Sequence, residues 1–216
     1  YHPEMIKAFK EKHGYDPREQ EDPSKDEKWL KFRCDMVSEV ANLVAEVVHK
    51  NGKVMSASPF PTPKMAARMV RQYWGDWNLD IVFPMVYHNF YTEDVSFVAD
   101  CTIENARDKQ DMTTLGAGVW AYNTPEMFAT MDAAFNNGAQ AISMFTAEEI
   151  KDPAIRKQFK EYADSVRAAR KANGGVVKAT YPKVADPDPF KKEGVMKVIE
   201  SRMQKLIAEA DGKTEL

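Results

Sequence analysis

Aromatic rings and polar side chains collect where apolar runs of this sequence end. In residues 79–91, the apolar run 81–86 passes directly into a series of rings and polar heads at 87–91. In α/β proteins with parallel strands, ligands bind just beyond the carboxyl ends of the strands. We therefore expect a buried strand here whose carboxyl end lines a site. The alternative is an amphipathic surface loop with half-buried rings.

Three further apolar runs end in side chains that suit a binding site. Residues 53–58 end at a serine, residues 114–120 lead into a tryptophan and a tyrosine, and residues 140–145 lead into acidic residues. Sugar rings stack their C–H faces on aromatic rings, and polar tips bond their hydroxyl groups. We therefore expect substrate contacts at the strand ends from Ser58, Tyr87, Tyr91, Trp120 and Tyr122. For each single ring, packing under a loop is the alternative.

Two side chains at these strand ends are candidates for catalysis. His88 can bond a hydroxyl group or transfer a proton near neutral pH. Glu148 is the carboxylate that follows the last of these strands, although acidic residues also favour a helix start for electrostatic reasons. A second carboxyl group for acid/base work is not supplied by Asp80, because it begins a strand and so lies at the opposite end of the sheet. We therefore expect at least one catalytic carboxylate upstream of Tyr1, or a protein that is not catalytic.

Arg33 stands on the apolar stripe of a predicted long helix, between Trp29 and Val37. A permanent charge at such a position needs a partner. In a barrel of strand–helix units, helix amino termini lie at the same end as strand carboxyl ends, so we expect Arg33 near the substrate. The alternatives are a bond to a carboxylate of a neighbouring loop and direct contact with a ligand.

Helix and strand patterns alternate along the first 172 residues. A short helix at 3–13 and a long helix up to about residue 50, opened by a capping box of Ser24 and Glu27, come first. Strands then start near residues 53, 80, 114 and 140, and helices follow from about 62, 92, 124 and 152. This spacing matches the roughly 30 residues of a βαβ unit, and the alternation predicts parallel strands with helices outside.

The predicted fold class is therefore α/β, of the (β/α)8 TIM-barrel type. A full barrel needs about 250 residues, so this chain supplies about the last four βα units. We assign residues 1–172 to the C-terminal part of the barrel and residues 173–216 to a linker and C-terminal extension. In that extension we expect one more strand at 176–181 and an amphipathic helix that begins near residue 190.

The composition is that of a globular chain with little net charge. Hydrophobic residues make up 44%, and the net charge of −3 gives no electrostatic case for nucleic acid or an anionic membrane. No apolar run approaches the roughly 20 residues of a membrane span. The histidines lack ligand spacing and no phosphate-loop motif is present, so we expect neither a metal nor another cofactor. Cys34 and Cys101 are expected to be buried free thiols, with a disulfide as the alternative.

Several stretches together resemble a known family. These are FKEKHGYDP, WLKFRCDMV, a strand ending in serine, WGDWNLDIVFPMVYHNFY, GVWAY and NNGAQAISMF, over roughly residues 5–170. The motifs W-x-x-F-R and L-D-x-V-x-P-M-x-Y are the more specific ones. The chain is similar to the bacterial glycoside-hydrolase-like (β/α)8 barrel proteins of the "glycosyl hydrolase-like 10" type. The resemblance implies a carbohydrate-active enzyme that hydrolyses O-glycosidic bonds, exported to the periplasm, the cell surface or the medium.

Three functional hypotheses follow. The first is a glycosidase for a poly- or oligosaccharide, with this segment lining the sugar-binding cleft. The second is a non-catalytic carbohydrate-binding or scaffold module with a degenerate barrel. The third is a barrel enzyme with a non-sugar substrate, since fold does not fix function.

The half-barrel hypothesis also predicts a partner. Half a barrel leaves sheet edges and apolar surface uncovered, so we expect either the missing N-terminal half or a homodimer partner to cover them. The chain begins at Tyr1 and shows no signal peptide, so we expect a processed or cut chain.

Overall fold

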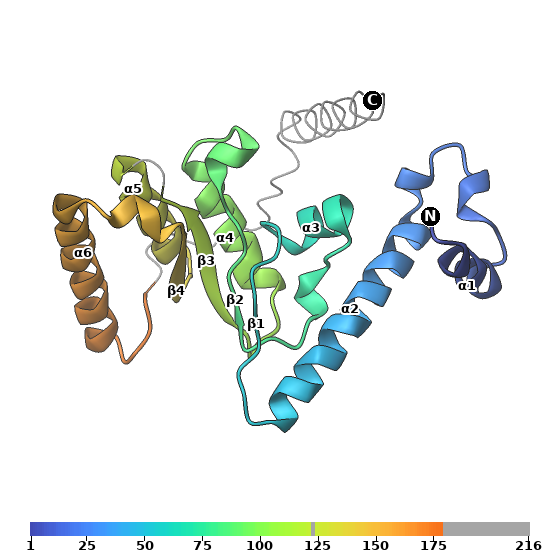
Figure 1. Cartoon of the computed structure of the whole chain (residues 1–216), viewed down its shortest axis with the longest axis horizontal. Coiled ribbons are helices and arrows are strands. Elements are labelled where there is room, and N and C mark those ends of the chain that lie inside the picture. Colours follow the sequence, from blue (N-terminus) through green and yellow to red (C-terminus); the bar gives the residue numbers. More distant parts are fainter. Residues whose placement is uncertain (122–123, 179–216) are drawn as a thin grey trace, which may run out of the picture.

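The computed structural model describes residues 1–121 and 124–178 of the 216-residue chain (Figure 1). Two helices come first, α1 (Pro3–His13) and α2 (Glu27–Lys50). Strands and helices then alternate: β1 (Ser56–Ala57), α3 (Pro63–Val70), β2 (Ile81–Val82), α4 (Ser96–Asp108), β3 (Thr114–Trp120), α5 (Thr124–Asn136), β4 (Ala141–Phe145) and α6 (Pro153–Ala172). The chain is an α/β protein, as the alternation in the sequence predicts.

The four strands form one parallel sheet in the order β1-β2-β3-β4. Ile81 of β2 pairs with Ser56 on one side and with Thr114 on the other. A further bridge between Met85 and Gly118 continues the pairing of β2 with β3. When sequential parallel strands are joined by right-handed crossovers, every connecting helix lies on the same side of the sheet.

That side of the sheet carries the main hydrophobic core. Side chains of a strand alternate between its two faces, and the odd-numbered residues of β3 point into this core. One cluster joins β3 to α4 and α5 through Ala117, Val119, Val98, Cys101, Met127 and Met131. A second cluster brings Leu115 and Val82, which pair in register, against Trp74 and Trp77.

The other face of the sheet is only partly covered by the described residues, as the exposed Ser56, Thr114 and Ser143 show. Gly116 and Gly118 of β3 leave room there for the chain that follows β2. A Cβ atom on Gly116 would lie 2.4 Å from Cδ1 of Phe83, and one on Gly118 would lie 3.1 Å from the carbonyl oxygen of Pro84. Phe145 of β4 is 53% exposed, which shows how open this face is at its carboxyl edge.

Helix α1 packs against the amino-terminal part of α2. Ile6 and Phe9 of α1 bury themselves with Trp29 and Phe32 of α2. The predicted capping box of Ser24 and Glu27 is wrong, because Asp26 caps α2: its Oδ1 accepts from the amides of Lys28 at 2.9 Å and Trp29 at 3.1 Å. Ser24 instead belongs to a short 3-10 turn, Pro23–Lys25.

Other element boundaries also differ from the sequence prediction. The sequence predicts a strand over residues 53–58, but only Ser56–Ala57 is paired. The helix expected from residue 92 begins at Ser96, because a 3-10 turn, His88–Tyr91, precedes it and Thr92 has a left-handed backbone (φ 58°). Residues 176–178 are not paired as a strand, and the rest of the predicted strand and the predicted C-terminal helix lie outside the described residues.

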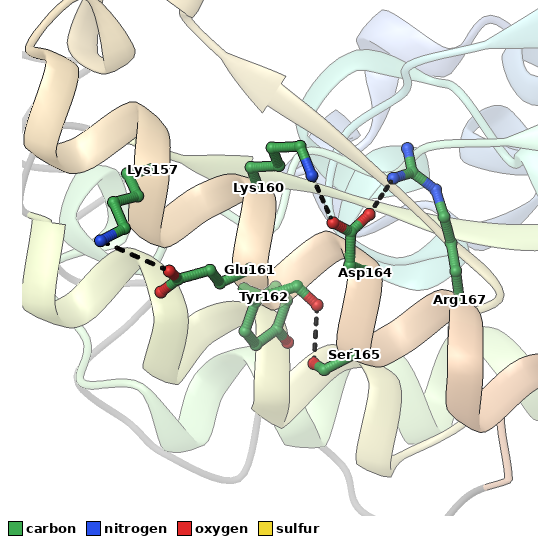
Figure 2. A network of polar contacts seen from close by, with 7 residues as sticks. All are labelled: Lys157, Lys160, Glu161, Tyr162, Asp164, Ser165 and Arg167. Atoms are coloured by element: carbon green, nitrogen blue, oxygen red, sulfur yellow. Dashed lines mark hydrogen bonds and ion pairs between the residues drawn. The ribbon is translucent and has the colours of Figure 1, made fainter.

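Helix α6 forms the outer wall beside β4 and α5. Its inner face packs on the core through Ile155, Phe159 and Tyr162. Its outer face carries the polar network of Figure 2, in which Asp164 binds Lys160 at 2.7 Å and Arg167 at 3.0 Å. Such exposed pairs one turn apart contribute little stability, so this network indicates a solvated face and no site.

Two further predictions concern the cysteines and the membrane. Cys34 in α2 and Cys101 in α4 are buried and free, as expected. Among the described residues, no helix combines the length and apolar character needed to cross a membrane.

Candidate functional site

Three aromatic rings meet at the carboxyl edge of the sheet. Tyr87 follows β2, Trp120 ends β3 and Phe145 ends β4, and we call these three residues the ring triad. The ring centroids are 5.6 Å apart for Tyr87 and Trp120, 5.9 Å for Tyr87 and Phe145, and 5.8 Å for Trp120 and Phe145. Trp120 and Phe145 are register partners, so strand pairing sets their contact.

The ring triad remains accessible. Phe145 is 53% exposed, and Tyr87 and Trp120 are half-buried. Burial raises the pKa of Tyr87, so its hydroxyl stays protonated at neutral pH and can both donate and accept a hydrogen bond. The triad thus combines apolar ring faces with a polar tip, which is the combination that binds a sugar ring.

His88 and Glu126 form a second feature at the same edge. The His88 ring is buried, with 2% exposed, and its Nε2 lies 3.7 Å from Oε2 of Glu126 in the first turn of α5. Asn89 Nδ2 donates to the same oxygen at 3.4 Å. Neither ring nitrogen of His88 has a hydrogen-bond partner among the described residues. The side chain of Glu126 is 44% exposed, so the pair joins a buried imidazole to a carboxylate that solvent can reach.

Glu148 does not join these groups. It lies exposed in a 3-10 turn, Ala147–Ile150, where its amide donates to the Thr146 hydroxyl at 3.1 Å. Its carboxylate binds Lys151 at 2.9 Å. This arrangement matches the alternative interpretation of an acidic start to a helical turn.

The remaining predicted sugar contacts are placed differently. Ser58 is exposed just beyond β1, at the carboxyl edge. Tyr91 is buried, with 3% exposed, and its ring packs 5.3 Å from that of Phe97 in the core, where burial raises its pKa. Tyr91 is therefore not part of the accessible surface formed by the ring triad. Tyr122 lies outside the described residues.

Arg33 is half-buried on α2, and it does not contact the ring triad. Its guanidinium lies 4.8 Å from the centroid of the Trp29 ring, and its Nε donates to the Trp29 carbonyl oxygen at 3.3 Å. Among the described residues no carboxylate forms an ion pair with it, so the expected carboxylate of a neighbouring loop is not found there.

Asp80 lies at the amino edge of the sheet, as its place before β2 predicts. Its Oδ2 lies 2.8 Å from Nε2 of His49 and accepts from the Met55 amide at 2.7 Å. The hydrogen bond from the Met55 amide is the main cause of a lowered pKa of Asp80, and the bond to His49 is the second cause. Asp80 therefore ties α2 to β1 and β2, away from the carboxyl edge. In residues 1–121 and 124–178, no three His, Cys, Asp or Glu side chains group closely enough to hold a metal ion.

Sequence reasoning missed two residues of this edge. Phe145 ends β4 and faces the ring triad because its strand register matches that of Trp120, which pattern alone does not reveal. The sequence analysis does not single out Glu126, although it lies in the first helical turn after β3, as Glu148 lies in the first helical turn after β4. Comparing the first turns after each strand would have drawn attention to Glu126.

Comparison with known proteins adds no relative. No family model, no curated protein sequence and no solved structure matches this chain with statistical significance.

Proposed function

We propose that the protein is a glycoside hydrolase acting on an oligo- or polysaccharide, and that the described sheet forms one wall of its sugar-binding cleft. The observation that carries this proposal is the ring triad at the carboxyl edge of a parallel sheet. Ligands of such sheets bind at this edge, and accessible aromatic rings are suited to stacking on sugar. The resemblance of the strand and helix motifs to glycoside-hydrolase-like barrels supports the same substrate class.

The same proposal includes a (β/α)8 barrel of which these residues are about half. Sequential parallel strands with helices on one side are the arrangement of such a barrel, and the opposite sheet face would then line its interior. Helix α2 precedes β1, so a barrel would place an earlier strand against it. An exposed apolar stripe on α2 suits that contact: Met36, Val40, Leu43, Val44 and Val47.

Earlier strands of the same polypeptide fit this barrel better than a second copy of the chain. In a barrel made from two copies, β4 of one copy would stand next to β1 of the other. Helix α6 of the first copy and helix α2 of the second would then both lie between these two strands. Both helices would need the same outer position between those two strands. We therefore favour an N-terminal half of the barrel over a homodimer.

For the chemistry, the pair of His88 and Glu126 is the favoured acid/base candidate of this wall. In glycoside hydrolysis, one carboxylic acid protonates the leaving oxygen. A second carboxylate either attacks the sugar carbon itself or activates a water molecule that does so. Glu126 is accessible and lies next to an imidazole, whereas Glu148 is bound to Lys151. The second carboxylate would come from the other half of the barrel.

A non-catalytic carbohydrate-binding module is the second candidate. Glycoside hydrolysis generally needs two carboxyl groups, and of Glu126 and Glu148 the second is held in an ion pair with Lys151, which favours recognition without hydrolysis. The rings alone would suffice for such a module.

The test uses the full-length natural gene product. Its intact mass would be measured first, and its activity then assayed on a panel of polysaccharides and aryl glycosides. A mass well above 24.5 kDa together with sugar release supports the proposal. Saturable sugar binding without turnover would identify a binding module, and neither binding nor turnover on the whole panel would contradict both candidates.

A further inference from the structure

A cavity of about 540 Å³ lies between α2 and α3, and none of its lining residues belongs to the ring triad. Pockets for small molecules have volumes of about 300–1,000 Å³, so its size suits such a ligand. We propose that this α2–α3 pocket binds an α-amino acid with a large apolar side chain, that is, a small zwitterion with an apolar body. The inference goes beyond the proposed carbohydrate function and does not depend on it.

The floor of the α2–α3 pocket is apolar and uncharged. Leu30 and Cys34 of α2 pack with Ala67 of α3 in one buried cluster, where Sγ of Cys34 lies 3.9 Å from the Ala67 carbonyl oxygen. Burial is the main cause of a raised pKa of Cys34, so its thiol carries no charge at neutral pH. Such a surface favours contact with hydrocarbon groups over contact with charged groups.

Tyr73 adds a ring and a polar tip to the same pocket. Its side chain is half-buried and packs against the floor. Burial is the main cause of its raised pKa, so the hydroxyl keeps its proton at neutral pH and can donate a hydrogen bond. The floor and this ring together suit an apolar body such as a phenyl group.

Six charged side chains line the pocket, three of each sign, and four of them are paired with each other. Arg68 of α3 binds Glu27 of α2 at 2.9 Å, and Lys31 binds Asp35 at 2.7 Å along α2. These two ion pairs neutralise most of the charge around the opening.

Lys64 and Asp76 are the two charged residues of the pocket that remain. Within the described part of the chain, neither side chain forms an ion pair or a hydrogen bond. Lys64 exerts only a weak attraction on the buried Glu104, and Asp76 only a weak attraction on Lys31. A ligand with one anionic and one cationic group would pair both residues.

A backbone contact brings the segments that carry these two charges together. Pro63 directly precedes Lys64, Gly75 directly precedes Asp76, and a Cβ atom on Gly75 would lie 3.5 Å from Cβ of Pro63. Because consecutive Cα atoms are only about 3.8 Å apart, Lys64 and Asp76 extend from neighbouring parts of the backbone. A ligand whose two charges lie on one carbon atom, as in an α-amino acid, suits this arrangement better than an extended zwitterion.

The experiment uses the full-length protein and L-phenylalanine as the probe. Its analogue 2-phenylethylamine lacks the carboxylate, 3-phenylpropanoate lacks the ammonium group, and glycine lacks the phenyl group. Calorimetry measures the affinities, and the amide NMR signals of Cys34 and Ala67 report binding in the pocket. The variants are Lys64→Met and Asp76→Asn, with two controls at exposed residues outside the pocket, Lys7→Met and Glu39→Gln. Circular dichroism verifies that each variant is folded.

We expect L-phenylalanine to shift both amide signals and to bind about threefold or more tightly than each analogue, because one exposed ion pair is worth up to about fivefold in affinity. Lys64→Met should bind L-phenylalanine and 2-phenylethylamine equally well, since the carboxylate has lost its partner. Asp76→Asn should bind L-phenylalanine and 3-phenylpropanoate equally well, and the two controls should behave as wild type.

Three results would overturn the inference. These are equal affinity of the wild type for L-phenylalanine and either singly charged analogue, binding that leaves the Cys34 and Ala67 signals unshifted, and no binding of L-phenylalanine. Sugar binding at the ring triad is measured separately, so each of these results leaves the proposed function intact.

Discussion

The Tyr87 ring meets the Trp120 ring edge-on, with an angle of 78° between the ring planes. This contact depends on how closely β2 and its continuation approach β3. Met85 pairs with Gly118, and the absence of side chains at Gly116 and Gly118 lets residues 83–85 lie against β3. The two glycines of β3 thus help to position the ring triad.

Gly116→Ala should disturb this arrangement. The new methyl group would lie 2.4 Å from the Phe83 ring, which would have to move. Overpacking of this kind costs about 1–3 kcal/mol of the free energy of unfolding. Urea denaturation would measure the loss, with Ser143→Ala, at an exposed position in register with Gly118, as the control. Equal stabilities of Gly116→Ala and wild type would contradict the close approach.

Glu104 makes stability depend on pH. Its side chain is fully buried in α4, and neither carboxylate oxygen has a well-formed hydrogen bond in the described residues. Burial raises its pKa from 4.5 to about 7, against the opposing effects of the Thr62 hydroxyl and Lys64. The folded state therefore holds a proton that the unfolded state releases, so this residue's contribution to stability falls as the pH rises from about 4.5 to about 7.

Glu104→Gln should remove that pH dependence. Above pH 7 the variant should be more stable than wild type by about 2–3 kcal/mol, and below pH 4.5 the two should be similar. Denaturation curves at several pH values would measure this difference. Glu39→Gln, at an exposed position of α2, is the control. A variant that is less stable than wild type at pH 8 would show that the charged carboxylate is satisfied in the folded protein.

Asp26 should be important for the stability of α2. It caps the helix and also accepts a hydrogen bond from the Tyr15 hydroxyl at 2.6 Å, which is the leading cause of a Tyr15 pKa of about 12. Asp26→Ala should cost about 1 kcal/mol or more, whereas Asp26→Asn should retain most of the cap. Thermal unfolding would rank the variants. An Asp26→Ala protein as stable as wild type would argue against this cap.

Glu126 should matter more for hydrolysis than Glu148. Loss of a general acid or base lowers kcat by about 100-fold or more. We therefore expect Glu126→Gln to lose turnover while sugar affinity changes little, and Glu148→Gln to keep both. Steady-state kinetics on the substrate found in the activity panel would separate the two. The reverse result would return the catalytic assignment to Glu148.

The sequence predicts the order of elements well, because helix and strand periodicities and the Gly and Pro boundaries are local signals. The helix limits near Pro3 and Asn51 and the strand from Thr114 to Trp120 follow from such signals. The inward position of Tyr91 does not, because residues 88–91 form a 3-10 turn that directs this ring into the core. The contact of Trp120 with Phe145 depends on strand register, so it cannot be read from local pattern.

The most direct test of the central claim is the effect of Trp120→Ala on sugar binding. Calorimetry would compare the full-length wild type, Trp120→Ala and Met112→Ala, a change at a residue that is 92% exposed in the turn before β3, on neutral and acidic hexasaccharides. We predict that wild type and Met112→Ala bind at least one hexasaccharide equally well and that Trp120→Ala binds it about tenfold more weakly. Undiminished binding by Trp120→Ala would contradict the assignment of the ring triad as a sugar site.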